Sequence, residues 1–474
     1  MKYEILSQGY ITKRQPGTPT GIAAGPRCVS RGRGEIACSF MGQEALGRND
    51  FKPMMVRSTD NGETWSEPKL IWPELQDRCS IFGSISGSPQ GDMYYYGMRT
   101  PIDQPGEMAW NETTQGLKQN ELVWSRSRDF GHTWEPLRVI PMPIPGSAEA
   151  PGPMCVTRRG DLVCCYSPCN SHDPQLKAAR NQVISLFSRD GGLTWSHRSM
   201  LRYPEPDASG AEAWVVELAD GRLLGTAWHA HQEDRPNAYA VSSDAGASWS
   251  PTRSTGTMGH STGLAPLADG RALFVYVQRK FGDIGIWMAV ANPTDADFGL
   301  VINERVWAAE VAVQGKGSTD FVDWTSFAFG EPSAMSQSTP GIITIRSMVS
   351  RFGRLIASCR IVVRRWVAVA MEALLPHFGR FAEQDDAFAA EAQRGSVRGV
   401  GRGAAATARE EAPRPTHEPR RIHVQLLAFA HRHRQRLAPE REHHHAVAEE
   451  LHHPPRRPRA RQVRVLEAHT LVEP

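Results

Sequence analysis

An octapeptide of the form Ser-x-Asp-x-Gly-x-Thr/Ser-Trp occurs four times in the first two thirds of this 474-residue chain. Its aspartates are Asp60, Asp129, Asp190 and Asp244, which lie about 55 to 70 residues apart. In a tight turn the carboxylate accepts hydrogen bonds from backbone N–H groups, and the glycine takes a positive φ. The tryptophan adds an apolar body that packs on a neighbouring sheet. The repeat therefore predicts a recurring structural unit, in which these aspartates are structural residues.

A second pattern recurs between the octapeptides: an apolar run, a polar turn with glycine, and another apolar run. It occupies residues 27–40, 154–166, 214–228 and 263–277. Turn residues between two β-rich runs are the strongest short-range signal for a β-hairpin. Each unit thus consists of a strand, a hairpin, a strand, a long loop, a strand, the octapeptide and a strand. This order is that of a β-propeller blade.

We therefore predict an all-β protein with a six-bladed β-propeller over residues 22–335, preceded by an N-terminal lead-in, residues 1–21. The sixth blade is expected to begin near Phe321 and to be incomplete or altered. The fifth blade lacks its octapeptide, since residues 291–299 stand in its place. The first five blades are predicted at 22–75, 76–140, 143–202, 205–253 and 256–312.

The composition of the chain changes after residue 335. Lys316, Tyr276 and Asn303 are the last residues of their types, whereas Arg, Ala, Pro and His accumulate to the end. Such a segment buries little apolar surface, so residues 336–474 are predicted to be an irregular, low-complexity tail. GC-rich DNA translated in a shifted frame gives the same bias, and we favour this interpretation. If neither alternative frame after codon 335 encodes a further blade, the frameshift interpretation is wrong.

Charge and cysteine content exclude some classes of partner. The 54 basic and 51 acidic residues nearly balance, so neither a nucleic-acid nor a membrane partner is expected. No apolar run has the length of a signal peptide core or a membrane span, which predicts a cytoplasmic location. The 8 cysteines fit no zinc-site spacing, so we expect buried free thiols, no metal and no cofactor. The sequence does not indicate an oligomeric state.

The octapeptides and hairpins resemble those of the sialidase superfamily, the Asp-box or bacterial neuraminidase repeat proteins, over about residues 20–335. The resemblance implies that the octapeptides, hereafter Asp boxes, lie on the propeller face away from the active site. It also implies a glycosidase in which three arginines bind a substrate carboxylate. An aspartate would act as acid/base, and a tyrosine assisted by a glutamate would be the nucleophile.

The pattern of this family carries over best at Glu212, which precedes the hairpin Val-Val-Glu-Leu-Ala-Asp-Gly-Arg. Arg279 is the candidate for one arginine. Ala24 and Trp228 stand where the resemblance implies the other two, and no tyrosine occurs between Phe329 and Ser333, where the nucleophile would lie. These departures favour a terminal acidic sugar other than sialic acid.

Polar residues in loops at one end of the inner strands are the candidates for the site. Carboxylates from different blades can act as general acid and base, and a histidine can transfer a proton near neutral pH. His229 and His231 share a strand face, which leaves joint metal ligation as an alternative to substrate binding. The catalytic candidates are Glu212, Glu331 and His260; the substrate-binding candidates are Arg279, His229, His231, Arg99, Glu149 and Asp50.

The sequence thus favours a sialidase-like exo-glycosidase that hydrolyses a terminal sugar of an oligosaccharide or glycoconjugate. Two alternatives remain open. One is a non-catalytic carbohydrate-binding propeller, and the other is a polysaccharide lyase with a histidine or tyrosine base.

Overall fold

The fold consists almost entirely of β-strands. The computed structural model describes residues 3–15, 17–150, 152–230, 235–279, 282–308, 329–336, 342–349 and 355–363. Side chains are described from Tyr10 onward and, in the last three of these segments, for Pro332 and Ser333 alone. Within this part of the chain, one short 3₁₀ helix, η1 (Pro73–Leu75), accompanies the strands.

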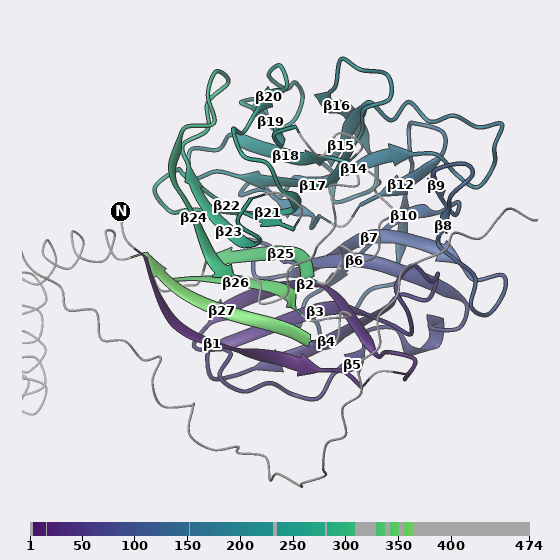
Figure 1. Ribbon diagram of the computed structural model, residues 1–474, viewed down its shortest axis with the longest axis horizontal. Helices are drawn as coiled ribbons and strands as arrows, with labels where there is room; N and C mark the ends of the chain where they lie inside the picture. Colours follow the sequence, from purple (N-terminus) through teal and green to yellow (C-terminus); the bar gives the residue numbers. More distant parts are fainter. Residues whose placement is uncertain are drawn as a thin grey trace, which may run out of the picture. The chain divides into compact units, whose positions relative to one another are not determined.

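Five consecutive antiparallel sheets in the described residues form propeller blades (Figure 1). First strands of neighbouring blades pack beside one another, as in blades 1 and 2 and in blades 4 and 5, which makes them the inner strands. Blade 1 contains β2 (Ile22–Gly32), β3 (Glu35–Gln43), β4 (Lys52–Ser58) and β5 (Lys69–Leu70). Blade 2 contains β6 (Cys79–Gly87), β7 (Met93–Pro101), β10 (Glu121–Ser127) and β11 (Arg138–Ile140). A separate ribbon, β8 (Trp110–Asn111) and β9 (Gly116–Leu117), lies in the loop between β7 and β10.

The next three blades have the same strand order. Blade 3 contains β12 (Ser147–Glu149), β13 (Cys155–Val156), β14 (Leu162–Cys169), β15 (Gln182–Ser188) and β16 (Ser196–Arg202). Blade 4 contains β17 (Gly210–Glu217), β18 (Leu223–His229), β19 (Ala238–Ser242) and β20 (Arg253–Ser254). Blade 5 contains β21 (His260–Pro266), β22 (Ala272–Gln278), β23 (Gly285–Ala291) and β24 (Leu300–Ala308). The predictions of an all-β propeller and of these five blades are confirmed.

A further antiparallel sheet combines the two ends of the described chain. Its order is β1 (Tyr3–Lys13), β27 (Leu355–Val363), β26 (Ile342–Val349) and β25 (Phe329–Ser336), and Figure 1 shows β1 beside β27. β25 packs against β2 and β21. We refer to it as the β1–β27 sheet.

The β1–β27 sheet differs from what the sequence predicts. β1 lies in the predicted lead-in, and β26 and β27 lie in the segment predicted to be an irregular tail. The stretches Ile-Ile-Thr-Ile-Arg-Ser-Met-Val and Leu-Ile-Ala-Ser-Cys-Arg-Ile-Val-Val are rich in β-branched residues, which favour strands. The compositional bias of the longer segment obscured them. Residues 364–474 lie outside the described part of the chain, and the frameshift interpretation stays a prediction.

Each Asp box is a turn closed by its own side chains. In the first, Asp60 accepts hydrogen bonds from Thr64 N at 2.9 Å and from Ser58 Oγ at 2.7 Å. Ser58 Oγ in turn accepts from Gly62 N at 2.8 Å, where φ is +87°. The residue before each box glycine also has a positive φ, which makes the turn left-handed over two residues. The same serine–aspartate bond recurs at Asp129, Asp190 and Asp244.

The tryptophans of the Asp boxes join neighbouring blades. Trp249 of blade 4 donates from Nε1 to Ser185 Oγ of blade 3 at 3.0 Å and packs on the apolar cluster between these two blades. Trp195 packs on the cluster between blades 2 and 3, where its ring meets Trp124 edge-on at 6.3 Å. The boxes therefore stabilise the joints between blades as well as their own turns.

Acid is expected to destabilise the propeller through these boxes. Hydrogen bonds from the Thr64 hydroxyl, the Thr64 backbone N–H and Ser58 lower the pKa of Asp60 to about 2, and the equivalent donors lower that of Asp190 to about 2. An unfolded aspartate titrates near pH ~3.9. The stabilisation is therefore complete above pH ~4 and is lost as the pH falls toward 2.

Melting temperatures measured by circular dichroism should thus be level from pH 7 to 5 and fall between pH 4 and 2. Asp190→Asn should melt lower at pH 7 and show a smaller acid-induced drop. An equal acid-induced drop in this variant would exclude the box as its source.

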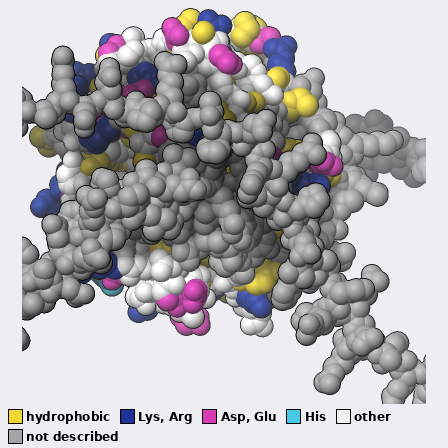
Figure 2. Space-filling view, turned by 90° about the vertical axis from the view of Figure 1, so that its left-hand side faces the viewer, with side chains coloured by type: hydrophobic (Ala, Val, Ile, Leu, Met, Phe, Trp, Pro, Cys, Tyr) yellow, Lys and Arg dark blue, Asp and Glu magenta, His cyan; other side chains and the backbone are white. Residues whose placement is uncertain are grey.

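Charged side chains on the surface occur with both signs along the visible edge in Figure 2. Several form partly exposed pairs, such as Arg126 with Asp92 and Arg222 with Asp220. Pairs of this kind contribute little stability, about 0–1 kcal/mol each.

No helix in the described part of the chain is long and apolar enough to cross a membrane. The 7 cysteines whose side chains are described are free thiols, several of them buried.

Candidate active site

The candidate site lies at the end of the blades opposite the Asp boxes. Each Asp box connects the third strand of a blade to its fourth. Because neighbouring strands are antiparallel, the start of the inner strand and the loop between the second and third strands lie together at the other end. We call this end the loop face. It collects segments from every described blade.

Inner strands bulge at the same place on the loop face. The pairing register shifts between Ala24 and Arg27 in β2, between Ala211 and Trp214 in β17, and between His260 and Thr262 in β21. A residue with positive φ lies in each bulge: Gly25 at +59°, Glu212 at +46° and Ser261 at +39°. Bulges of this kind redirect side chains and are common beside active sites.

Glu212 occupies a conformation that glutamate rarely adopts. A left-handed backbone costs a residue with a side chain about 1–2 kcal/mol, so neighbouring groups must hold it. Its backbone N–H donates to Glu149 Oε2 at 3.0 Å, and its carbonyl oxygen accepts from Thr262 Oγ1 at 3.2 Å. Ser261 Oγ donates to its Oε1 at 2.7 Å. The residue is 8% exposed, so this glutamate is buried among groups from blades 3, 4 and 5.

Apolar and aromatic groups lie next to Glu212. Ala211 pairs with Trp228 across β17 and β18, and both belong to a small buried cluster with Ala230. The Trp228 ring meets the His260 ring edge-on at 5.5 Å. His260, the first residue of β21, is itself buried. The predicted catalytic residues Glu212 and His260 therefore lie on adjacent inner strands, joined through Ser261.

Two arginines of this region, Arg27 and Arg279, are buried. The Arg27 guanidinium lies 5.0 Å from the ring centroid of Trp214, which reaches it from the inner strand of the non-adjacent blade 4. Its Nη1 also donates to Pro26 O at 3.1 Å. Arg279 follows β22 directly, at the loop face of blade 5. Each of the two residues is 1% exposed.

Asp50 supplies a carboxylate from the loop between β3 and β4. Its Oδ2 accepts from Glu44 N at 3.0 Å and lies 3.8 Å from Lys52 Nζ. Its Oδ1 is buried and accepts no hydrogen bond from the described residues. Burial raises the pKa of Asp50, against the effects of the Glu44 N–H and the Lys52 charge. A carboxyl group with a raised pKa is suited to donate a proton.

Two family models match this sequence. A BNR repeat-like domain matches residues 108–286, and a BNR/Asp-box repeat matches residues 56–67. Solved sialidase structures share the fold. The NanB sialidase of Streptococcus pneumoniae superposes with a TM-score of 0.52 at 15% identity, over 76% of this chain and 71% of that one. Residues 56–67 and 108–286 thus match BNR repeat models, and the described chain has the fold of a sialidase-like β-propeller.

Other structures extend the comparison of this BNR propeller. A protein of unknown function from Dyadobacter fermentans superposes with a TM-score of 0.59 at 20% identity, over 76% of this chain and 99% of that one. The intramolecular trans-sialidase of Ruminococcus gnavus gives 0.51 at 12% identity, over 74% and 97%. These identities show a common fold. No curated protein sequence matches the chain.

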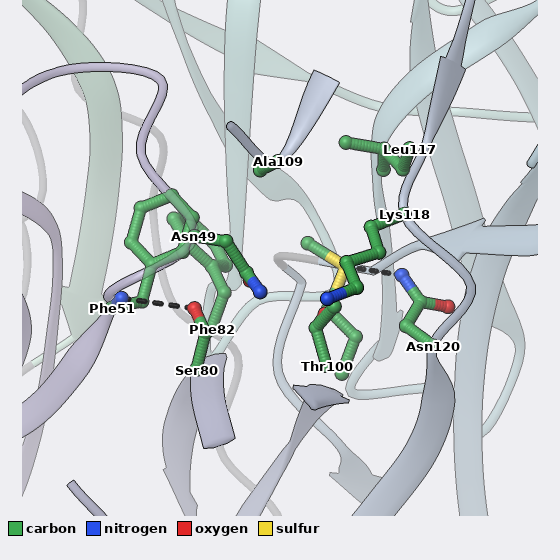
Figure 3. Close-up of a pocket in the computed structure, with 10 residues that line it drawn as sticks. Asn49, Phe51, Ser80, Phe82, Thr100, Ala109, Leu117, Lys118 and Asn120 are labelled. Carbon is green, nitrogen blue, oxygen red and sulfur yellow. Dashed lines mark hydrogen bonds between the residues drawn. The ribbon is translucent and has the colours of Figure 1, made fainter. Parts of the chain in front are cut away.

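The loops of blades 1 to 3 form a connected layer on the loop face of the BNR propeller. Asn49 Nδ2 and Lys118 Nζ both donate to Glu107 Oε1, each at 2.6 Å. Asn49 and Lys118 extend toward one another across a small recess beside Phe51 (Figure 3). Asn120 binds both backbone groups of Ala148 in blade 3, at 2.8 and 2.9 Å. The layer fixes the loop that carries Asp50.

The other predicted site residues are placed differently. Arg99 Nε donates to Glu121 Oε1 at 2.7 Å, so its charge is matched within blade 2. The His229 ring contacts Tyr203, with the centroids 4.5 Å apart. His231 and the side chain of Glu331 lie outside the described residues, although the backbone of Glu331 is part of β25. Among the described residues, no group of three His, Cys, Asp or Glu side chains could hold a metal ion.

Sequence reasoning missed three residues of this region: Arg27, Ser261 and Thr262. The resemblance implies an arginine at the position of Ala24, three residues before Arg27. Ser261 and Thr262 directly follow His260, the residue that was chosen. Superposing the two bulged strands would have found Ser261, since it has the position in β21 that Glu212 has in β17.

Proposed function

We propose that this BNR propeller is an exo-glycosidase that hydrolyses a terminal sugar of an oligosaccharide or glycoconjugate. The observation that carries the proposal is Glu212, a buried carboxylate in a left-handed bulge, held by groups from two neighbouring blades. Strain of this kind persists where the surrounding structure enforces it, and it is concentrated at functional sites. The sialidases that share the fold act on glycans, which supports a glycan substrate at a general level.

In this proposal Asp50 is the general acid and Glu212 is the general base. Asp50, whose pKa burial raises, donates its proton to the glycosidic oxygen as the bond to the anomeric carbon breaks. Glu212 accepts a proton from the water that attacks this carbon. The products are the free sugar and the shortened glycan; Glu212 releases its proton to solvent, and Asp50 takes up a proton from solvent, which restores both groups. Burial of Glu212 and preorganised hydrogen bonds favour the step by avoiding reorganisation.

An acidic substituent on the sugar is the preferred substrate feature in this proposal. Arg279 lies at the loop face, and a guanidinium can bind a carboxylate through two parallel hydrogen bonds. Arg99 binds Glu121 within blade 2. Ala24 and Trp228 provide no guanidinium, so a substrate that requires three arginines is disfavoured.

The β1–β27 sheet is, in our proposal, the sixth blade of the ring. Its strand β25 packs against β2 of blade 1 and β21 of blade 5. Ser333 Oγ also donates to Pro26 O at 2.6 Å, which ties β25 to the bulge of β2. A sheet made from both ends of the propeller sequence would leave fewer exposed strand edges in the ring.

Asp50→Asn tests the proposed general acid. With aryl glycosides that have a poor leaving group, the variant is expected to lose about 10²–10³-fold in kcat, because the amide cannot protonate the departing oxygen. With a dinitrophenyl leaving group, which needs no protonation, the loss should be much smaller. Rates with both substrates are compared. Asp103→Asn is the control, because Asp103 is more exposed than Asp50 and binds Lys118 in the segment between β7 and β10.

Equal losses with both leaving groups would remove Asp50 from the role of general acid. Saturable glycan binding by the unchanged protein without any turnover would favour the carbohydrate-binding alternative. Release of an unsaturated sugar, seen by its ultraviolet absorbance, would favour the lyase.

A further inference from the structure

Three neighbouring side chains form hydrogen bonds with three different atoms of Glu212. Glu149 on β12 accepts from its backbone N–H, Thr262 on β21 donates to its carbonyl oxygen, and Ser261 on β21 donates to its carboxylate. The three contacts come from the blades on either side of blade 4. We call these three residues the Glu212 clamp.

Glu149, the second carboxylate here, is held in contact with the backbone of Glu212. Its Oε2 accepts a backbone N–H at 3.0 Å, and such a bond favours the ionised form of a carboxylate. The same bond satisfies the N–H that the bulge removes from the ladder between β17 and β18. Its carboxylate therefore acts on the backbone of Glu212.

Ser261 acts on the charge of Glu212. A hydroxyl that donates to a carboxylate at 2.7 Å stabilises the ionised form. Ser261 has a left-handed backbone of its own, with φ at +39°, in the equivalent bulge of β21. The two bulges thus place a donor and an acceptor face to face between blades 4 and 5.

We infer that Glu149, Ser261 and Thr262 are positioning residues: Glu149 and Thr262 hold the strained backbone of Glu212, and Ser261 keeps its carboxylate ionised and oriented. The inference rests on the proposed function, since it assigns separate roles to three carboxylates of the loop face. Asp50 donates the proton, Glu212 accepts it, and Glu149 holds Glu212 in place.

Other titratable groups belong to elements packed at this end of β17, and the Ser261 variants described below leave them unchanged. Burial raises the pKa of Cys169 to about 12 and that of Cys165 well above its usual range, so both thiols stay neutral near pH 7. The titratable groups on the elements packed against this end of β17 are Glu149 on β12, Cys165 and Cys169 on β14, His229 on β18 and His260 on β21.

The role of Ser261 is tested without turnover by infrared spectroscopy. The carboxylate band that Glu212→Gln removes from the spectrum is followed against pH in the unchanged protein and in Ser261→Ala. The variant should bind the proton about 3- to 10-fold more tightly, which is the effect of losing one hydrogen bond to a charged group.

The role of Glu149 is tested by amide hydrogen exchange of the peptide that contains Glu212. Glu149→Gln keeps an acceptor oxygen and should retain the protection against exchange. In Glu149→Ala the amide should exchange at least about tenfold faster. In an active enzyme, Glu149→Ala should also lower kcat by about 10–100-fold with a smaller change in KM, because the base is misplaced.

An unchanged Glu212 titration in Ser261→Ala, or equal protection in Glu149→Ala and Glu149→Gln, would overturn the clamp. Should Ser261→Ala fail to fold, Ser261→Cys replaces the strong donor by a weak one and should give a shift in the same direction. If the titration and the exchange change as expected while no glycoside is hydrolysed, the clamp stands and the hydrolase proposal fails.

Discussion

Replacing Glu212 by glutamine is expected to lower kcat by about 10²–10⁴-fold without lowering the melting temperature. Glutamine has almost the same shape and can still accept the hydrogen bond from Ser261, but it cannot take a proton. The backbone contacts to Glu149 and Thr262 do not depend on the replaced group. Steady-state rates with the best aryl glycoside, combined with thermal unfolding, measure both effects.

Glu217→Gln is a matched control for this experiment. Glu217 lies on the same strand, β17, but at the end near the Asp boxes, where it accepts from Arg158 N at 2.8 Å. Its replacement should leave kcat within about twofold, as expected for a change away from the reacting groups. Glu212→Gln with more than a tenth of the original kcat, or an equal loss in Glu217→Gln, would exclude Glu212 as the base.

The parts of the fold that local sequence determines were predictable. An Asp box contains the donors and acceptors of its own turn within eight residues, so four copies suffice to locate the turns. The blade hairpins are equally local. The β1–β27 sheet was not predictable in this way because its pairing joins Tyr3 to Val363, and no short pattern reports a contact between the two ends.

The candidate site was predictable where a single residue carries the signal. Glu212 was found from the hairpin that follows it, and His260 from its place at the start of an inner strand. Ser261 was missed because its contact with Glu212 crosses from blade 5 to blade 4. Arg27 was missed because the residue that it touches, Trp214, lies on a blade that is not its neighbour. Both contacts depend on ring geometry, which sequence alone does not contain.

The largest effect on stability is expected from replacing Trp214, the residue that contacts Arg27. Trp214 is buried, packs on the apolar cluster between blades 4 and 5, and presents its ring to the guanidinium of Arg27 in blade 1. Truncating a buried tryptophan to alanine costs about 3–5 kcal/mol. Trp214→Ala should therefore lower the melting temperature by about 5–10 °C.

Trp214→Phe separates the ring contact from the loss of volume. Phenylalanine keeps an aromatic face toward Arg27, so this variant should lose about half as much stability as Trp214→Ala or less. Leu193→Ala is the surface control, because Leu193 is 78% exposed in the third Asp box and should melt as the unchanged protein does.

A double-mutant cycle then measures the contact itself. Arg27→Met keeps much of the buried volume without the charge, and is combined with Trp214→Phe and Trp214→Ala. Denaturant unfolding should give a coupling of about 1–2 kcal/mol between Arg27 and Trp214, because a buried guanidinium over an indole ring is desolvated. Strictly additive losses would mean that the two side chains pack independently, and that the contact between blades 1 and 4 does not stabilise the ring.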